Sequence, residues 1–339
     1  MRLRTGLIAL CAALCAALTP TVANAATSTY APQEDAQKFT TSVGGWTHDR
    51  EYSNPALCIL GEIGVVCPSV TNTYVGSGGA DGASDGHIRT SYGILVSLLG
   101  QSSTGIWTSP EFTYNGAQGK PAQKLTFSAK FRSNVAELLG VGGSNNATYS
   151  VAIVPSEPGE AVTVINNETL PNVQSEWKAI DEVSIPGNAL QIGQKYRIVI
   201  RTSLNTPVAS GVGSGNVDYD DVVLKAQSAS KKQLKNDVKE GFGDVAATNG
   251  PRAAVALRCP AAVAPSKCRI NVKVKLGRKI ITKRKVVTLR AGKAKAVTLK
   301  VKKRFQKKIL KAKRVVVLAQ VKAGGEKFTA KKRVKLRKS

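Results

Sequence analysis

The sequence is poor in the side chains that most often carry catalysis. Its histidines are His48 and His87 alone. It contains no H-E-x-x-H metal motif, no G-x-S-x-G nucleophile motif and no glycine-rich phosphate loop. Glycosidases require only a pair of carboxylates, so the many Asp and Glu residues do not exclude that class. Taken together, these absences favour a binding protein over an enzyme.

Apolar runs long enough to cross a membrane are also missing. A bilayer span takes about 20 apolar residues, and the run over 7–18 is shorter than that. That run follows Arg2 and Arg4 and is succeeded by an A-x-A sequence ending at Ala25. A basic head, an apolar core and a small-residue end together predict a secretory signal peptide over residues 1–25. An uncleaved membrane anchor is the alternative interpretation. We therefore expect a secreted, extracellular protein that associates with the cell wall.

Cysteine is infrequent, and its placement indicates disulfides. Two of the six cysteines lie in the expected signal peptide. The other four form two pairs with eight residues between the members of each, namely Cys58 with Cys67 and Cys259 with Cys268. Cysteines in even number are usually oxidised in an extracellular protein. Zinc is the alternative, but it prefers pairs about two to four residues apart, so we expect two local disulfides.

Acidic residues are almost absent from the last quarter of the chain. Residues 251–339 contain 31 lysines and arginines against one acid, Glu326. Residues 26–228 contain 12 lysines and arginines against 18 acids, a net charge of −6. Between them, residues 229–250 are polar and could form a short helix, but their three glycines favour a hinge. A change of composition at such a segment predicts a domain over 26–228, a polar linker over 229–250 and a second domain over 251–339.

Helix-length amphipathic patterns are absent from residues 26–228, where short runs alternate apolar and polar side chains instead. Gly, Asn, Ser and Pro separate these runs. The clearest of them are residues 124–131, 149–154 and 196–201. Period-two runs bounded by turn residues are typical of an antiparallel β-sandwich. The expected fold class of the whole chain is therefore all-β.

Two segments of this region resemble a known type of sandwich. Residues 107–112 (WTSPEF) are similar to the strand-entry segment of jelly-roll, galactose-binding-like carbohydrate-binding modules. Residues 218–224 (DYDDVVL) are similar to the closing strand of the same modules. The resemblance covers about residues 39–226. It implies a jelly-roll sandwich that recognises a glycan or a cell-surface component, although sandwiches of this type bind varied ligands or none.

Sugar recognition requires exposed aromatic faces for the pyranose rings, with polar groups nearby for the hydroxyls. Most sandwich tryptophans are packed inside, but Trp46 follows two glycines and is the best candidate for exposure. Tyr52, Tyr74 and Tyr92 fall in loop-rich sequence. We expect these four residues to be the glycan-binding candidates.

The same resemblance implies a structural calcium ion, to which an aspartate of the closing strand contributes. Asp220 or Asp221 is that residue here. Adjacent residues on a strand point to opposite faces, so only one of them can face inward. The alternative is a pair of exposed acids bonded to a neighbouring turn. The loop 81–86 (DGASDG) is a second cation candidate, although a plain glycine-rich turn explains its sequence better.

The basic region contains the clearest strand patterns of the chain. Apolar residues alternate with cations or polar residues over 269–276, 297–302, 315–322 and 328–337, although Lys332 breaks the inner row of the last run. Half-buried strands with one cationic face explain this alternation. Apolar residues four apart between 301 and 309 indicate a helical turn. The region resembles the Lys/Arg-rich, Ig-like β modules that end many exported actinobacterial proteins, which implies a small Ig-like sandwich.

So many cations with one acid repel one another and should recruit an anionic partner. No Trp or Tyr follows Pro251, so we expect electrostatic, salt-sensitive binding without base stacking. The expected partner is an anionic polymer of the cell wall or envelope, with nucleic acid bound only non-specifically. The alternatives are an adhesive surface protein without a small ligand and an extracellular nucleic-acid binder. The candidate polyanion-binding residues are Lys273, Lys275, Lys300, Lys302, Lys303, Arg304, Lys307, Lys308, Lys331, Arg333, Lys335 and Arg337.

Overall fold

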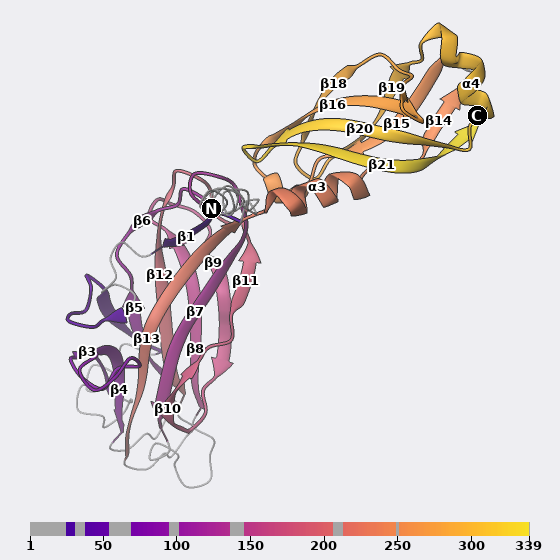
Figure 1. Cartoon of the computed structure of the whole chain (residues 1–339). Coiled ribbons are helices and arrows are strands. Elements are labelled where there is room, and N and C mark those ends of the chain that lie inside the picture. Colours follow the sequence, from indigo (N-terminus) through magenta and orange to yellow (C-terminus); the bar gives the residue numbers. More distant parts are fainter. Residues whose placement is uncertain are drawn as a thin grey trace, which may run out of the picture.

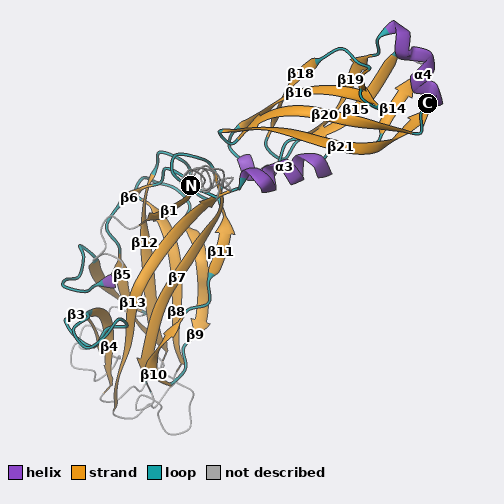
Figure 2. Ribbon diagram, viewed as in Figure 1, coloured by secondary structure: helices purple, strands orange, loops and turns teal. Residues whose placement is uncertain are grey.

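The computed structural model shows a chain built mainly of strands, which confirms the all-β fold class (Figures 1 and 2). It describes residues 25–30, 38–53, 69–94, 102–135, 146–205, 213–248 and 251–338. The body of the expected signal peptide, residues 1–24, lies outside the described residues. The expected disulfide between Cys58 and Cys67 lies outside them too.

The first sheet of the N-terminal sandwich is antiparallel and is centred on the long strand β13. Its order over the described residues is β10-β7-β13-β4-β3, with β1 beside β13 and β11 beside β7. The strands are β1 (Thr27–Tyr30), β3 (Ser69–Val75), β4 (His87–Ile94), β7 (Ala122–Asn134), β10 (Val173–Ala179), β11 (Val183–Pro186) and β13 (Gly213–Ser228).

The second sheet completes the sandwich, with the order β2-β5-β12-β8-β9 and β6 beside β12. The alternating runs of the sequence supply the core, because every second side chain of β7, β8 and β12 is buried. Trp107, Phe127 and Tyr219 are fully buried in it. The strands are β2 (Thr47–Tyr52), β5 (Ser102–Thr108), β6 (Phe112–Thr113), β8 (Asn146–Pro155), β9 (Val162–Thr169) and β12 (Lys195–Asn205).

The basic region forms a separate, curled sheet around its own hydrophobic core. The described strands follow the order β17-β16-β20-β21-β14-β15-β19, with β18 beside β16. The pairing of β14 with β21 is parallel and joins the strands β17-β16-β20-β21 to the strands β14-β15-β19. The strands are β14 (Val245–Thr248), β15 (Arg252–Arg258), β16 (Lys267–Leu276), β17 (Lys279–Ile280), β18 (Lys285–Arg290), β19 (Ala294–Lys300), β20 (Arg314–Ala323) and β21 (Glu326–Lys338).

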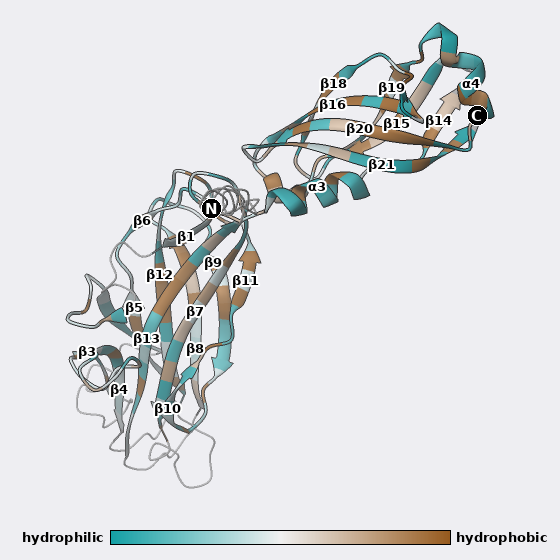
Figure 3. Cartoon of the chain, in the orientation of Figure 1, coloured by the Kyte–Doolittle hydropathy of each residue, from teal (hydrophilic) through white to brown (hydrophobic). Residues whose placement is uncertain are grey.

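The interval 229–250, expected to be a polar linker, is structured over 229–248. Helix α3 (Lys231–Glu240) begins at Ser230, whose side chain accepts a hydrogen bond from Gln233. Most of its residues are hydrophilic (Figure 3), but Leu234 and Val238 are buried in the core of the basic region. The linker prediction is therefore wrong here, because two apolar residues four apart are enough to dock an otherwise polar helix.

Gly241 is required by close packing at the end of α3. A β-carbon at this position would lie 2.6 Å from the β-carbon of Arg258, so only glycine allows the end of α3 to pack on β15. The expected helical turn is present as a 3₁₀ turn, η5 (Lys303–Phe305), followed by α4 (Gln306–Lys311). Another 3₁₀ turn, η4 (Ala261–Val263), follows β15.

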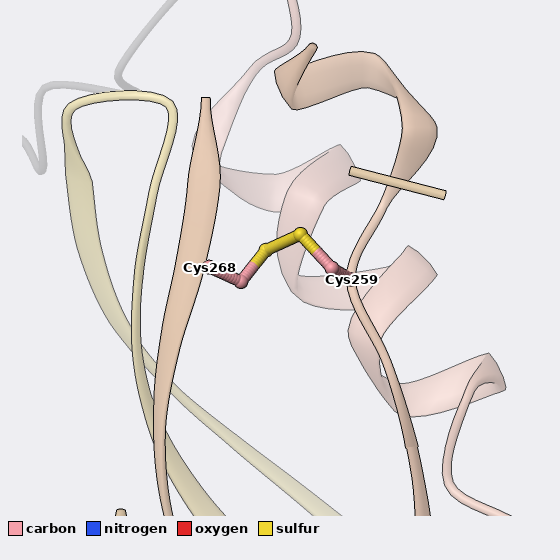
Figure 4. The surroundings of a disulfide bond; sticks show 2 residues. All are labelled: Cys259 and Cys268. Carbon is pink, nitrogen blue, oxygen red and sulfur yellow. A yellow bond between two sulfur atoms is a disulfide. The ribbon is translucent and has the colours of Figure 1, made fainter. Parts of the chain in front are cut away.

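The predicted disulfide between Cys259 and Cys268 is confirmed (Figure 4). Their α-carbons are 5.7 Å apart, and both side chains are fully buried. The bond joins the end of β15 to the start of β16 across the loop that contains η4.

Removing this disulfide should destabilise the basic region by about 3 kcal/mol, because it closes a short loop in the unfolded chain. All three tryptophans lie before residue 178, so tryptophan fluorescence would not report this loss. The suitable measurement is amide hydrogen exchange of β16 and β20 in a Cys259→Ala/Cys268→Ala variant. Unchanged protection of these strands would contradict the expectation.

Candidate functional site

The residues expected to bind a glycan do not form an exposed aromatic platform. Trp46 is 4% exposed and packs against Phe39 in the core, so the expectation that it is exposed is wrong. Tyr92 is 3% exposed, and its hydroxyl donates to the carbonyl of Thr202. Tyr52 and Tyr74 are half-buried against the same core. The sequence around these residues is rich in turn formers, but the rings themselves pack inward.

A charged cluster that the sequence did not reveal lies on the outer face of the first sheet. Asp218 of β13 is fully buried at its centre. Arg89 of β4 donates to both carboxylate oxygens, from Nε at 2.7 Å and from Nη2 at 2.9 Å. Arg132 of β7 donates from Nε to Oδ2 at 2.6 Å. His87 of β4 is also fully buried, with Nε2 3.3 Å from Oδ2.

Trp177 of β10 covers one side of this cluster. The guanidinium carbon of Arg132 lies 4.7 Å from the centre of the indole ring, which is a cation–π contact. The imidazole of His87 meets the same ring edge-on at 5.4 Å. The indole Nε1 donates to the carbonyl of Gly78, so the ring also fixes the loop above the sheet.

The arginines determine the charge state of Asp218. Burial alone would raise the pKa of this carboxyl, but hydrogen bonds from Arg89, His87 and Arg132 lower it far below its ordinary value. Asp218 is therefore ionised at neutral pH in the folded protein. The arginine side chains are 30% and 24% exposed, so the cluster presents a rigid cationic edge to solvent.

The glycine-rich loop 76–86 folds back over the same face of the sheet. The backbone nitrogen of Ala80 donates to Oδ2 of Asp220 at 2.7 Å. Asp85, 5% exposed, lies close enough to Asp220 for the two carboxyl groups to interact directly. Oδ1 of Asp85 is buried without a hydrogen-bond partner in the described part of the chain. The structure thus brings together the two cation candidates that are separate in the sequence.

Only one of the two adjacent aspartates of β13 enters this pair. Asp220 is fully buried, whereas Asp221 lies at a bulge with a φ of +49° and pairs with Lys130 at 2.6 Å. Burial, together with the negative charge of Asp85, raises the pKa of Asp220 to about 8, against the hydrogen bonds from the backbone N–H groups of Ala80 and Asp221. Asp81 is occupied by Lys38 and Lys130.

The pair Asp85–Asp220 suits calcium in charge and in ligand type. Two buried carboxyl groups in contact repel each other when ionised, and a hard divalent cation removes that repulsion. Calcium takes about six to eight oxygen ligands. No group of three or more His, Cys, Asp or Glu side chains in the described residues is arranged to hold a metal ion. Backbone carbonyls and water would therefore have to supply the remaining ligands.

The expected polyanion-binding residues are spread over several faces of the basic region. Lys303, Arg304, Lys307 and Lys308 lie on η5 and α4, and all are exposed. Arg337 is 77% exposed and pairs with Asp244 at 2.8 Å. The outward faces of β16 and β21 contain Lys273, Lys275, Lys331, Arg333 and Lys335, while Lys300 ends β19 and Lys302 follows it.

Lys332, which interrupts the inner row of β21, reaches the edge of the core. Its ammonium group donates to the carbonyl of Phe242 at 3.2 Å. Phe242 follows α3 and is itself buried. An inward lysine is accommodated because its charged end leaves the apolar interior for a backbone acceptor.

Comparisons with known proteins yield only distant structural similarity. No family model matches the sequence, and no curated protein matches it. The structure is similar to a carbohydrate-binding module of the β-sandwich superfamily, with a TM-score of 0.32, 12% identity, and coverage of 57% of this chain and 62% of that one. The structure is also similar to a β-glucuronidase from Parabacteroides merdae, with a TM-score of 0.24, 11% identity, and coverage of 69% of this chain and 28% of that one. For the structure of infectious bursal disease virus strain Gt, the TM-score is 0.21 and the identity 11%, and the match covers 47% of this chain and 38% of that one.

With TM-scores this low, none of these similarities assigns a function to the chain. The resemblance of the C-terminal region to actinobacterial modules stays a prediction. Within the described residues, no helix is long and apolar enough to cross a membrane.

Proposed function

We propose that this protein is a secreted, non-catalytic binding protein whose basic region holds it on an anionic polymer of the cell envelope. One observation carries the proposal. Residues 251–339 contain 31 cations and one acid, and the fold turns these cations outward while burying the apolar residues between them. A surface of this kind binds polyanions by displacing their counterions.

The few acids nearby do not neutralise this surface. Glu326 pairs with Lys120 of the N-terminal sandwich at 2.7 Å. Among the described residues after 250, Arg337 is the one cation with an ion pair, to Asp244. Nearly all of the cationic surface is thus available to an external anion.

Glycan recognition by the N-terminal sandwich is a second candidate, which one cleft favours. The cleft has a volume of about 210 Å³ and lies among β7–β11. Tyr149, Glu168, Lys178 and Asp181 line it, and the Tyr149 hydroxyl donates to Oε2 of Glu168 at 2.9 Å. Hydroxyl, carboxylate and ammonium groups are those with which proteins hydrogen-bond to sugar hydroxyls, while the Tyr149 ring itself is buried in the core.

A structural calcium ion at Asp85 and Asp220 is part of the proposal. The support for it is the contact between two buried carboxyl groups that no cation of the described chain neutralises. Its role would be to fix loop 76–86 on the sheet.

Pelleting of the purified full-length protein with isolated cell walls would test the envelope proposal. We expect strong pelleting at about 50 mM salt and release by about 200 mM, because each displaced counterion steepens the salt dependence. Extraction of the anionic polymers from the walls should abolish pelleting. Salt-independent pelleting with extracted walls would overturn the electrostatic proposal and favour the glycan cleft.

A further inference from the structure

The outer face of β18, β16, β20 and β21 differs from the rest of the cationic surface. β20 lies between β16 and β21, and its side chains alternate strictly. Val315, Val317, Ala319 and Val321 point into the core. The outward residues of the same strand are Val316, Leu318, Gln320 and Lys322, so its outward side is apolar at one end and polar at the other.

Three cations meet in one row at the polar end of this strand. Lys322 of β20 is in register with Arg269 of β16 and with Lys327 of β21. Adjacent strands are about 4.8 Å apart, so the row spans about 10 Å. All three side chains are exposed, and none has an ion pair within the described residues. Like charges opposite one another across strands destabilise a sheet, and a bound anion would remove that cost.

The next rows combine amide, apolar and cationic side chains. In the first of them, Nδ2 of Asn271 donates to Oε1 of Gln320 at 2.9 Å, while Oδ1 of Asn271 is buried without a hydrogen-bond donor. Val286 of β18, 42% exposed, is in register with Asn271. In the row beyond, Lys273 and Lys331 lie on either side of Leu318. On this face, cations therefore flank β20 in the rows of Lys322 and Leu318, and polar residues flank it in the row of Gln320 between them.

The polar end of this strip is hollowed into an open groove of about 490 Å³. We call it the β20 groove, and it is lined by Arg269, Asn271, Arg284, Val286, Gln320, Val321, Lys322, Lys327, Phe328 and Thr329. An adjoining hollow of about 410 Å³ shares Arg269 and Lys322 and continues to the hairpin turn at Gly324. The two together suit a chain-like ligand better than a compact one.

We propose that the β20 groove binds a segment of a carboxylated polysaccharide. Its guanidinium and ammonium groups match carboxylates, the exposed amide of Gln320 can form a hydrogen bond with a sugar hydroxyl, and the exposed Val286 can pack against the C–H face of a ring. A linear polyphosphate matches the cations of the groove but has no sugar ring and no sugar hydroxyls for its apolar and amide side chains. Nucleic acid requires aromatic faces for its bases, and the region's aromatic side chains, Phe305 and Phe328, are 6% and 8% exposed. The inference rests on the proposed function and specifies its ligand.

Two charge-matched variants of the full-length protein separate this groove from general electrostatics. One replaces Arg269, Lys322 and Lys327 with glutamine, and the other replaces Lys303, Lys307 and Lys308, which are equally exposed but lie on η5 and α4. Both lose three positive charges. The probes are polygalacturonate, inorganic polyphosphate of similar charge, and neutral dextran, titrated by calorimetry at about 100 mM salt, where the Debye length is about 10 Å.

We expect the groove variant to lose at least about tenfold in affinity for polygalacturonate, or about 1.4 kcal/mol, and the η5–α4 variant to lose much less. The affinity for polyphosphate should fall equally in both variants. A Gln320→Ala variant, which changes no charge, should lose affinity for polygalacturonate but not for polyphosphate. Equal losses in both triple variants, or tighter binding of polyphosphate than of polygalacturonate by the unmodified protein, would overturn the inference and leave the proposed function standing. Absence of binding to either polyanion at low salt would overturn the proposed function itself.

Discussion

Replacement of Asp218 by asparagine is expected to lower the free energy of unfolding of the N-terminal sandwich by about 3 kcal/mol. The substitution keeps the shape of the side chain but leaves Arg89 and Arg132 facing each other without the carboxylate between them. Breaking a buried ion pair by removing one partner costs about 3–5 kcal/mol. The lower end applies here because the two arginines remain 30% and 24% exposed and keep part of their hydration. Urea denaturation followed by tryptophan emission measures this loss, because Trp177 lies on the cluster.

Asp81→Asn is the matched control for that substitution. Asp81 also pairs with two cations, Lys38 and Lys130, but its side chain is 44% exposed. Exposed ion pairs contribute about 0–1 kcal/mol, so this variant should unfold almost as the unmodified protein does. Equal losses in both variants would show that burial of Asp218 is not what makes it important.

Acidification provides a second test of the same network. The pKa of Asp218 is lowered in the folded state, so the stability that it contributes is fully present above its unfolded pKa of about 3.9. That contribution is lost as the pH falls below about 4 towards the folded pKa. The Asp218→Asn variant should lack this part of the acid dependence.

Alternation along single strands was enough to predict four strands of the basic region, β16, β19, β20 and β21. Each of β16, β20 and β21 buries one face and exposes the other, so the pattern is visible within a few residues. The disulfide between Cys259 and Cys268 could be predicted from the sequence for the same reason, because the two cysteines are only nine positions apart. For helix α3 the sequence left a short helix and a hinge as alternatives, because Leu234 and Val238 are its main buried side chains, too few for a clear periodic signal.

The candidate sites were harder to predict from the sequence, because their residues come from strands that are far apart in the chain. Asp218, Arg89, Arg132 and Trp177 lie on four strands, and only the pairing of β13 with β4 and β7 brings the first three together. Whether a single aromatic ring is exposed also depends on how the chain around it folds, which the local sequence does not determine. Trp46 follows a turn at Gly44 and Gly45, both with positive φ, and that turn directs the ring towards Phe39.

The calcium proposal was half visible in the sequence. Asp220 was a candidate on the closing strand and Asp85 on a glycine-rich loop, with more than a hundred residues between them. The register of β4 with β13 places the loop before β4 directly over Asp220. Sequence alone offered two weak candidates, whereas the fold offers one pair.

Replacement of Asp85 by asparagine is expected to change stability in opposite directions with and without calcium. In EDTA at pH 8 the variant should be more stable than the unmodified protein. An asparagine can still accept from the backbone nitrogen of Asp81, as Oδ2 of Asp85 does at 3.0 Å. Its amide nitrogen would take the place of Oδ1, which has no hydrogen-bond partner among the described residues, and donate to Asp220. A carboxylate repulsion thus becomes a hydrogen bond of about 1–2 kcal/mol.

The pH dependence without calcium follows from the same pair. The pKa of Asp220 is raised to about 8 in the folded protein, so the native state binds a proton that the unfolded chain releases near pH 3.9. The stability of the unmodified protein in EDTA should therefore fall as the pH rises from about 4 to 8. Asp85→Asn should flatten this slope because it removes the neighbouring charge.

With calcium the order should reverse. Calcium binds the ionised carboxylates of the native state, and a ligand at 100 times its dissociation constant adds about 2.7 kcal/mol, or a rise in melting temperature of about 5–11 °C for a domain of this size. Asp85→Asn should lose this rise, whereas Asp81→Asn, in the same loop but paired with lysines, should keep it. Melting curves in EDTA and in calcium for the three proteins decide the matter. If calcium raises the melting temperature of none of them, the ion does not bind here, and the hydrogen bonds of Gly78 with Trp177 and of Ala80 with Asp220 are what hold loop 76–86 in place.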